Sequence, residues 1–199
     1  MRHTLRTGGS HKIAWELKKY NVDTEVLDFV DLMQPRDFLK ILESRKHNRY
    51  LFIGFTFMFW DYQKTNKLIK ILKKYFPNTK FVMGGTADFI KDLGMDYYVN
   101  SFAEKSIPHL IDDILGKKEI KHQKRFNGKW INALHDYPAW HENNYYFEYL
   151  PNSFMQPFEL ATIEMQRGCR FKCKYCSFPL IGLKENNITT EQKLYDHIM

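Results

Sequence analysis

The segment "RYLFIGFTFMFWDYQKTNKLIKILKKYFPNTKFVMGG", residues 49–85, decides the fold, because it contains a strand, a helix and a second strand in succession. Residues 49–57 are almost continuously apolar or aromatic, which is typical of a strand covered on both faces. From residue 61 to 76, apolar side chains recur at helical spacing opposite lysines, and Pro77 ends this amphipathic helix. Residues 80–85 repeat the buried-strand pattern and end in two glycines. The segment therefore predicts a strand–helix–strand unit with parallel strands.

The same alternation extends on both sides of this segment. We expect further helices at residues 10–20, 35–46, 86–93 and 104–115, and further strands at residues 24–30 and 96–99. Such alternation with short connections predicts an α/β fold whose parallel sheet has helices on both faces. Ligands of such sheets bind beyond the carboxyl ends of the strands, and Thr56, Gly84 and Gly85 fall there.

The two glycines have two interpretations. Without side chains, Gly84 and Gly85 would let a large planar ligand or a phosphate approach the backbone closely. A tight turn before a helix explains them as well and is the simpler interpretation.

The beginning of the chain departs from the pattern. A helix is expected from Ser10, so only residues 1–5 remain for a first strand. In the flavodoxin-like strand order 2-1-3-4-5, that first strand is central. We therefore expect a chain that starts late, through a truncated or mispredicted beginning.

After residue 116 the sequence changes character. Asn127-Gly128 stands between two short β-type runs, which is the strongest short hairpin signal. Prolines and aromatics with little periodicity follow, as in an ordered linker. We assign residues 117–157 to this hairpin and linker, and residues 158–199 to the start of a second domain.

Composition limits the class of protein. The longest apolar run, residues 50–60, is about half of the ~20 residues that a membrane span needs. No basic-then-apolar leader opens the chain, and three clustered cysteines are an odd set for a disulfide scaffold. These observations favour a cytoplasmic protein without a membrane partner.

The chain is basic, with 30 Lys and Arg, 23 Asp and Glu, and a net charge of +7. A nucleic acid would suit such a charge. The positive charge increases at residues 117–129 and around the cysteines. A solvated, lysine-rich surface is the simpler interpretation.

All three cysteines lie in "RGCRFKCKYC", as Cys169, Cys173 and Cys176. A core would not accept the charged residues between them, and a disulfide would leave one thiol over. Shared metal ligation explains the C-x3-C-x2-C spacing, and the neighbouring cations lower thiol pKa values. Zinc would need a fourth ligand, whereas a 4Fe–4S cluster held by three cysteines keeps one iron open.

This loop resembles the cluster loop of the radical S-adenosylmethionine superfamily, whose signature is C-x3-C-x2-C with an aromatic residue before the last cysteine. Tyr175 occupies that aromatic position, and the preceding "LATIEMQRGC" resembles the first strand of the superfamily's barrel. The resemblance implies that residues 158–199 form the first strand, cluster loop and first helix of an incomplete (βα) barrel.

Residues 1–116 resemble the cobalamin-binding, Rossmann-like domain that precedes the barrel in one branch of this superfamily. The similarity places Thr56 in a Ser/Thr stretch after a middle strand, and Gly84 and Gly85 in a turn beside the corrin ring. The Asp-x-His-x-x-Gly motif that supplies a lower cobalt ligand is absent. His11 stands without the aspartate, and we interpret it as a surface helix residue.

The resemblance implies a reaction. The three cysteines would bind a 4Fe–4S cluster that reductively cleaves S-adenosylmethionine to a 5′-deoxyadenosyl radical, with cobalamin-dependent methyl transfer as one use of that radical. A flavodoxin or ferredoxin would supply the electron, and Tyr175 would flank the cluster or adenine. Only 23 residues follow Cys176, so we expect the N-terminal part of a longer enzyme or a split gene product.

Two alternatives come from other classes of protein. One is a zinc-bound basic adaptor that binds RNA through residues 117–130 and the aromatic linker. The other is a non-enzymatic remnant whose cluster only stabilises the fold. The substrate is not named by the sequence.

Overall fold

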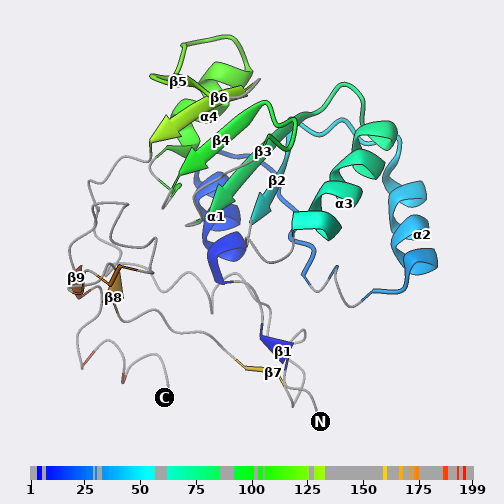
Figure 1. Ribbon diagram of the computed structural model, residues 1–199, viewed down its shortest axis with the longest axis horizontal. Coiled ribbons are helices and arrows are strands. Elements are labelled where there is room, and N and C mark those ends of the chain that lie inside the picture. The colour runs from blue at the N-terminus through cyan, green and yellow to red at the C-terminus, as the bar shows by residue number, and fades with distance from the viewer. Residues whose placement is uncertain are drawn as a thin grey trace. The chain divides into compact units, whose positions relative to one another are not determined.

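The structure is a computed structural model in which the chain forms two compact units, Phe29–Leu134 and Met1–Asp28 with His135–Met199 (Figure 1). It describes residues 4–5, 8–28, 30, 33–56, 62–85, 92–100, 103–104, 106–125, 128–132, 159–160, 166–167, 171, 173–174, 186–187, 192 and 195. Each unit is considered by itself.

The Phe29–Leu134 unit is an α/β sheet domain, as predicted. Its elements are α2 (Pro35–Arg45), β2 (Phe52–Thr56), α3 (Tyr62–Tyr75), β3 (Lys80–Gly85), β4 (Tyr97–Asn100), α4 (Ile107–Ile114), β5 (Gln123–Arg125) and β6 (Gly128–Asn132). The strand order is β2-β3-β4-β6-β5. The first four strands are parallel, and only β5 runs antiparallel to its neighbour.

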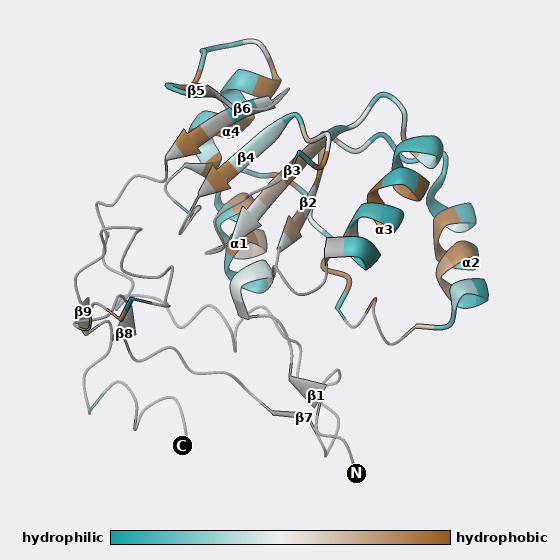
Figure 2. Ribbon diagram, in the orientation of Figure 1, coloured by the Kyte–Doolittle hydropathy of each residue, from teal (hydrophilic) through white to brown (hydrophobic). Residues whose placement is uncertain are grey.

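Helices cover both faces of this sheet. The core cluster on one face joins Phe38 of α2 and Ile69 of α3 to Tyr98 of β4. Neighbouring residues of a strand point to opposite faces, so Tyr97 faces the other side, where its hydroxyl group donates a hydrogen bond to Asp113 of α4. In α2 and α3, hydrophobic segments alternate with hydrophilic ones (Figure 2), as expected for helices that bury one face.

The hairpin predicted at Asn127-Gly128 exists, but the sequence interpretation of it needs two corrections. Arg125 pairs with Gly128, so Gly128 belongs to β6 instead of to the turn. The hairpin also extends the sheet, because β6 pairs in parallel with β4 along Tyr97–Asn100. This pairing joins segments about thirty residues apart, which local sequence patterns do not reveal.

The strand predicted at residues 24–30 is wrong for its described part. Residues 22–28 have no strand structure, although their burial alternates between partly buried and exposed. An alternating pattern makes a strand only when a neighbour supplies hydrogen bonds.

The helix predicted at 104–115 begins at Ile107, with Pro108 in its first turn. Most of the helix predicted at 86–93 lies outside the described residues.

The described residues of the second unit contain a helix and short strand pairs. These are α1 (Gly8–Lys19), β1 (Thr4–Leu5), β7 (Glu159–Leu160), β8 (Gln166–Arg167) and β9 (Asn186–Asn187). β1 pairs with β7, and β8 pairs with β9. Thus β1 pairs with the cysteine-containing part of the chain and does not serve as a central strand of the five-stranded sheet.

His11 also corrects the sequence interpretation, which placed it on the surface of its helix. Its side chain is buried, and its Nε2 atom lies 2.6 Å from Oδ2 of Asp28, whose side chain is also buried. His11, Ala14 and Leu17 form a buried stripe along α1. Because Asp28 is distant in sequence, the surface interpretation had no signal of this partner.

Within the described part of the chain, no helix has the length and apolar character to cross a membrane.

Candidate functional site

The carboxyl ends of the parallel strands form one row of residues, which we call the carboxyl edge: Thr56, Gly84, Gly85, Asn100 and Asn132. Thr56 of β2 stands opposite Gly84 of β3 in the register. Gly85 stands opposite Asn100 of β4, and Asn100 opposite Asn132 of β6. The sheet thus brings together the three residues that the sequence placed at a ligand site, and adds two asparagines.

The two glycines of the carboxyl edge differ in their backbone. Gly85 has φ = 130°, a conformation that residues with a side chain rarely adopt. Gly84 has no such requirement, and a Cβ atom added there would meet, among the described residues, only the carbonyl oxygen of Phe55, at 3.7 Å. The backbone alone therefore explains the glycine at position 85. At position 84 the backbone gives no reason for glycine, so the close approach of a ligand remains a reason for it.

The sequence analysis missed the two asparagines. Each is the last residue of a β-type run, in "YYVN" and in "KWIN", at the position where parallel sheets place ligand-binding groups. The shared ending was visible in the sequence. Its significance required the β4–β6 pairing, which sets Asn100 beside Asn132.

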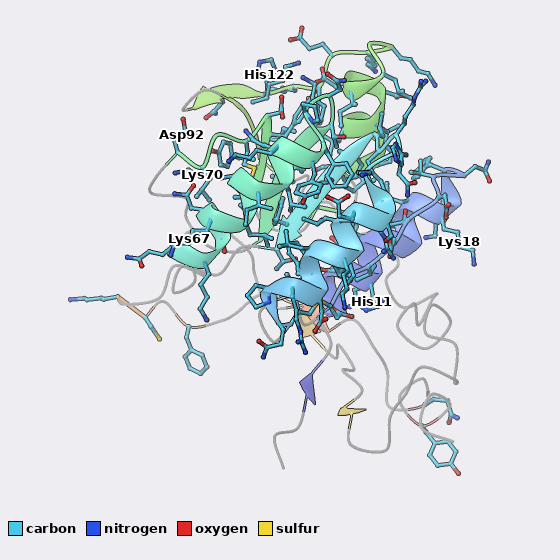
Figure 3. All side chains as sticks on the ribbon, turned by 90° about the vertical axis from the view of Figure 1, so that its right-hand side faces the viewer. His11, Lys18, Lys67, Lys70, Asp92 and His122 are labelled. Carbon is cyan, nitrogen blue, oxygen red and sulfur yellow. The ribbon has the colours of Figure 1, made fainter. Side chains whose placement is uncertain are left out.

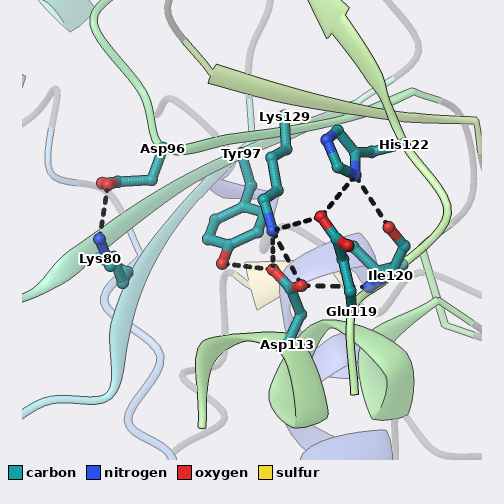
Figure 4. A network of polar contacts seen from close by, with 8 residues as sticks. All are labelled: Lys80, Asp96, Tyr97, Asp113, Glu119, Ile120, His122 and Lys129. Carbon is teal, nitrogen blue, oxygen red and sulfur yellow. Dashed lines mark hydrogen bonds and ion pairs between the residues drawn. The ribbon is translucent and has the colours of Figure 1, made fainter. Parts of the chain in front are cut away.

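A buried carboxylate anchors β6, and with it one end of the carboxyl edge (Figure 4). Asp113 of α4, whose side chain is 4% exposed, accepts hydrogen bonds from Lys129 Nζ, the Tyr97 hydroxyl group and the Ile120 N–H group. Burial alone would raise the pKa of Asp113, but these three donors outweigh it and lower the pKa below its usual value. Burial and the bond to Asp113 raise the pKa of Tyr97.

The hairpin end of this network is also fixed. The Lys129 ammonium group lies 3.7 Å from Glu119, and His122 Nδ1 donates a hydrogen bond of 2.9 Å to the Ile120 carbonyl oxygen. The connection between α4 and β5, through the Ile120 N–H group, and β6, through Lys129, are therefore both bound to the Asp113 carboxylate.

The loop before β4 is held by side-chain hydrogen bonds. Asp96 accepts one from the Phe81 N–H group at 2.9 Å and one from Lys80 at 3.1 Å. The buried Tyr98 hydroxyl group accepts a hydrogen bond from the Leu93 N–H group at 2.9 Å and donates one to Asp92 at 2.8 Å. These contacts fix the position of β4 relative to β3.

The cysteine loop belongs to the other unit and is described only in part. Cys173 is a partly exposed free thiol, next to the exposed Lys174. Cys169, Tyr175 and Cys176 lie outside the described residues, so the geometry of the predicted cluster site is not given by the structure. The described residues contain no group of three His, Cys, Asp or Glu side chains that could hold a metal. Two of the three cysteines, Cys169 and Cys176, are not among these described residues.

Comparisons with known proteins give a distant structural likeness. No protein-family model matches the chain, and no curated protein matches it. The N-terminal domain of a hypothetical protein from Thermotoga maritima is similar in structure, with a TM-score of 0.37 and 17% sequence identity, over 61% of this chain and 87% of that one. The candidate site therefore stands on this chain's own residues.

Proposed function

We propose that this chain binds a 4Fe–4S cluster through Cys169, Cys173 and Cys176 and takes part in the reductive cleavage of S-adenosylmethionine. The observation that carries the proposal is the spacing C-x3-C-x2-C, with Tyr175 before the last cysteine and a β-type run before the first. When bound, such a cluster supplies the electron that cleaves S-adenosylmethionine to a 5′-deoxyadenosyl radical.

The donor set fits this group. Three thiolates within eight positions can bind three irons of the cluster and leave the fourth open to a substrate. Arg170, Lys172 and Lys174 between the cysteines favour the thiolate form of each ligand and offset the negative charge of the cluster. Cys173 is a partly exposed free thiol, so a metal can reach it.

The second part of the proposal is that the carboxyl edge accepts a large planar ligand of the corrinoid class. Gly84 supports it, because the backbone conformation at this position does not require glycine. The missing side chain is instead explained by a ligand that approaches the peptide closely. A lower histidine ligand is not part of this proposal. His11 is buried, and its ring nitrogen contacts Asp28. The corrinoid would therefore be held by the carboxyl edge without a bond from His11 to cobalt.

Anaerobic reconstitution of the 199-residue chain with iron and sulfide tests the first part. We expect about four irons per chain and the broad absorption of a 4Fe–4S cluster. Cys173→Ala should lose the cluster, whereas Lys174→Gln, the matched change at the next residue, should retain most of it. S-adenosylmethionine should then alter the electron paramagnetic resonance spectrum of the reduced cluster.

Three results would reject this proposal. A protein that takes up zinc but no iron would favour the adaptor hypothesis. A colourless, iron-free protein whose three thiols are freely alkylated would exclude a metal site. A cluster whose spectrum does not respond to S-adenosylmethionine would favour a structural role.

A further inference from the structure

Helix α3 has an unusual charge composition. Its fourteen residues include five lysines and no aspartate or glutamate. Four of these lysines are exposed, at positions 64, 67, 70 and 74, and we call them the lysine face. An α-helix advances 100° and 1.5 Å per residue, so the lysine face covers an arc of about 120° and a length of about 15 Å.

The lysine face is directed away from the core. Ile69 and Leu72, on the opposite side of α3, are buried in the core cluster. Figure 3 shows Lys67 and Lys70 pointing away from the rest of the ribbon. The fifth lysine, Lys73, is not part of this face. Its ammonium group donates a hydrogen bond to the Gly94 carbonyl oxygen and lies 5.3 Å from the centre of the Phe81 ring.

Exposed lysines of α1 and α2 pair with carboxylates, whereas those of the lysine face do not among the described residues. In α1, Lys19 pairs with Glu16 at 2.9 Å, and at the end of α2, Lys46 pairs with Glu43 at 2.8 Å. Lys40 of α2 lies 3.8 Å from Asp37. Among the residues that the structure describes, no carboxylate lies within 4.0 Å of any lysine of the lysine face. Four positive charges along one helix thus repel one another, with no carboxylate of the described residues close enough to compensate them.

We infer that the lysine face binds the phosphate backbone of a nucleic acid without reading its sequence. Duplex DNA carries about one negative charge per 1.7 Å of its axis, so about nine charges lie along the ~15 Å of the lysine face. The four lysines are spread over this same length of helix and over one side of it, so several can contact such a line of charges, and the net charge of +7 adds long-range attraction. Base-specific contacts are not implied.

A membrane surface fits this helix less well. A helix that lies in a membrane interface inserts an apolar face beside its lysines. The apolar face of α3 is buried in the core cluster, and Ile71, which is 38% exposed, is the large apolar residue left among the lysines. Electrostatic contact with a polyanion is therefore the binding mode that this face supports.

The experiment measures how binding depends on salt. A fluorescein-labelled 25-base-pair DNA duplex is titrated with the full chain at 50 to 200 mM KCl, followed by fluorescence anisotropy. Each phosphate contact contributes about 0.9 to the slope of log K against log salt concentration. In the variant K64Q/K67Q/K70Q/K74Q, the slope should therefore be shallower by about 3 to 4. The wild-type affinity should fall about 100-fold more than that of the variant over this salt range.

The matched control removes the same charge elsewhere. Lys40, Lys117, Lys118 and Lys121 are also exposed, and their joint change to glutamine should leave the slope nearly unchanged. The double variant K67Q/K70Q should give about half of the full effect. Far-UV circular dichroism should show folded protein in every case, because all substituted side chains are exposed.

Several results would overturn the inference. The inference is wrong if wild-type protein does not bind the duplex at 50 mM KCl. It is also wrong if the control variant loses as much slope as the α3 variant. If vesicles with 30% phosphatidylserine bind through the lysine face and the duplex does not, the partner is a membrane. The result does not depend on the cluster, so failure of the proposed enzymatic function would leave this test intact.

Discussion

The ammonium group of Lys129 lies 2.9 Å from each carboxylate oxygen of Asp113, so one ion pair joins the last strand of the parallel set to the helix behind it. The same carboxylate accepts hydrogen bonds from Tyr97 and from the Ile120 N–H group. Four segments of the sheet domain therefore meet at one nearly buried side chain.

Asp113→Ala should lower the free energy of unfolding by about 2–3 kcal/mol, because hydrogen bonds to a buried charged group contribute about this much and three donors lose their acceptor. Asp112→Ala is the matched control, since no side-chain contact of Asp112 is part of the network, and it should cost less than about 0.5 kcal/mol. Urea denaturation at pH 7 measures both. Equal effects of the two changes would show that the network does not stabilise the domain.

Acid should weaken the domain through the same group. The pKa of Asp113 is lowered from its usual 3.8 in the folded state, so its stabilising contribution is complete above pH 3.8 and is lost as the pH falls through the folded value. Urea midpoints between pH 5 and pH 2 should fall more steeply for the wild type than for Asp113→Asn, which has no carboxylate to protonate. Parallel curves would contradict this assignment.

Gly128→Ala should be strongly destabilising, by about 2 kcal/mol or more. A Cβ atom at position 128 would overlap the Met95 carbonyl oxygen and lie 3.0 Å from that of Asp96, so backbone would have to move. The control is Gly54→Ala, where the closest described atom would be a Phe52 ring carbon at 3.6 Å. Thermal unfolding should separate the two variants by several degrees. A near-native melting temperature for Gly128→Ala would show that β6 can shift without loss.

Tyr98→Phe should cost about 1–3 kcal/mol, because the buried N–H groups of Leu93 and Met95 would lose their acceptor. Burial raises the pKa of Tyr98 to about 12, so the folded state favours the protonated hydroxyl group, and stability is lost as the pH rises from the usual value of 10 toward 12. Tyr97→Phe, which removes only a donor to Asp113, should cost less. Chemical denaturation at pH 7 and pH 11 tests both statements.

Gly84→Ala tests the carboxyl edge as a ligand site. It should change stability by less than about 0.5 kcal/mol, since its Cβ atom has only an ordinary contact with Phe55, but it should weaken cobalamin binding at least about tenfold. Gly85→Ala should instead lower stability by about 1–3 kcal/mol, because of its positive φ angle. Equilibrium dialysis with hydroxocobalamin measures the binding. Unchanged affinity in Gly84→Ala would remove the support that Gly84 gives to the corrinoid proposal.

Periodicity was sufficient for part of the fold. The lysine-lined helix α3 and the buried strand β3 were predicted within a residue or two, because each carries its own pattern of apolar residues. The strand predicted at residues 24–30 is wrong for its described part. Whether such an alternating segment forms a strand depends on a hydrogen-bonding neighbour, which the local sequence does not specify.

The parts of the site that were missed depend on contacts between distant residues. Asn132 became part of the carboxyl edge only through the parallel pairing of β4 with β6. Asp113 looks in sequence like an ordinary polar position of an amphipathic helix, and its role comes from donors on three other segments. His11 looked exposed for the same reason, because its partner Asp28 lies beyond the end of its helix.

The glycine that begins β6 is required by a steric demand that does not come from its hairpin. It passes the backbone of residues 95–96, where no side chain fits. A change in the turn would not relax this demand, so distant homologues that share this sheet should retain glycine there even after the lysines and aromatics around it have diverged. This one position would then help to recognise such homologues when overall sequence similarity no longer can.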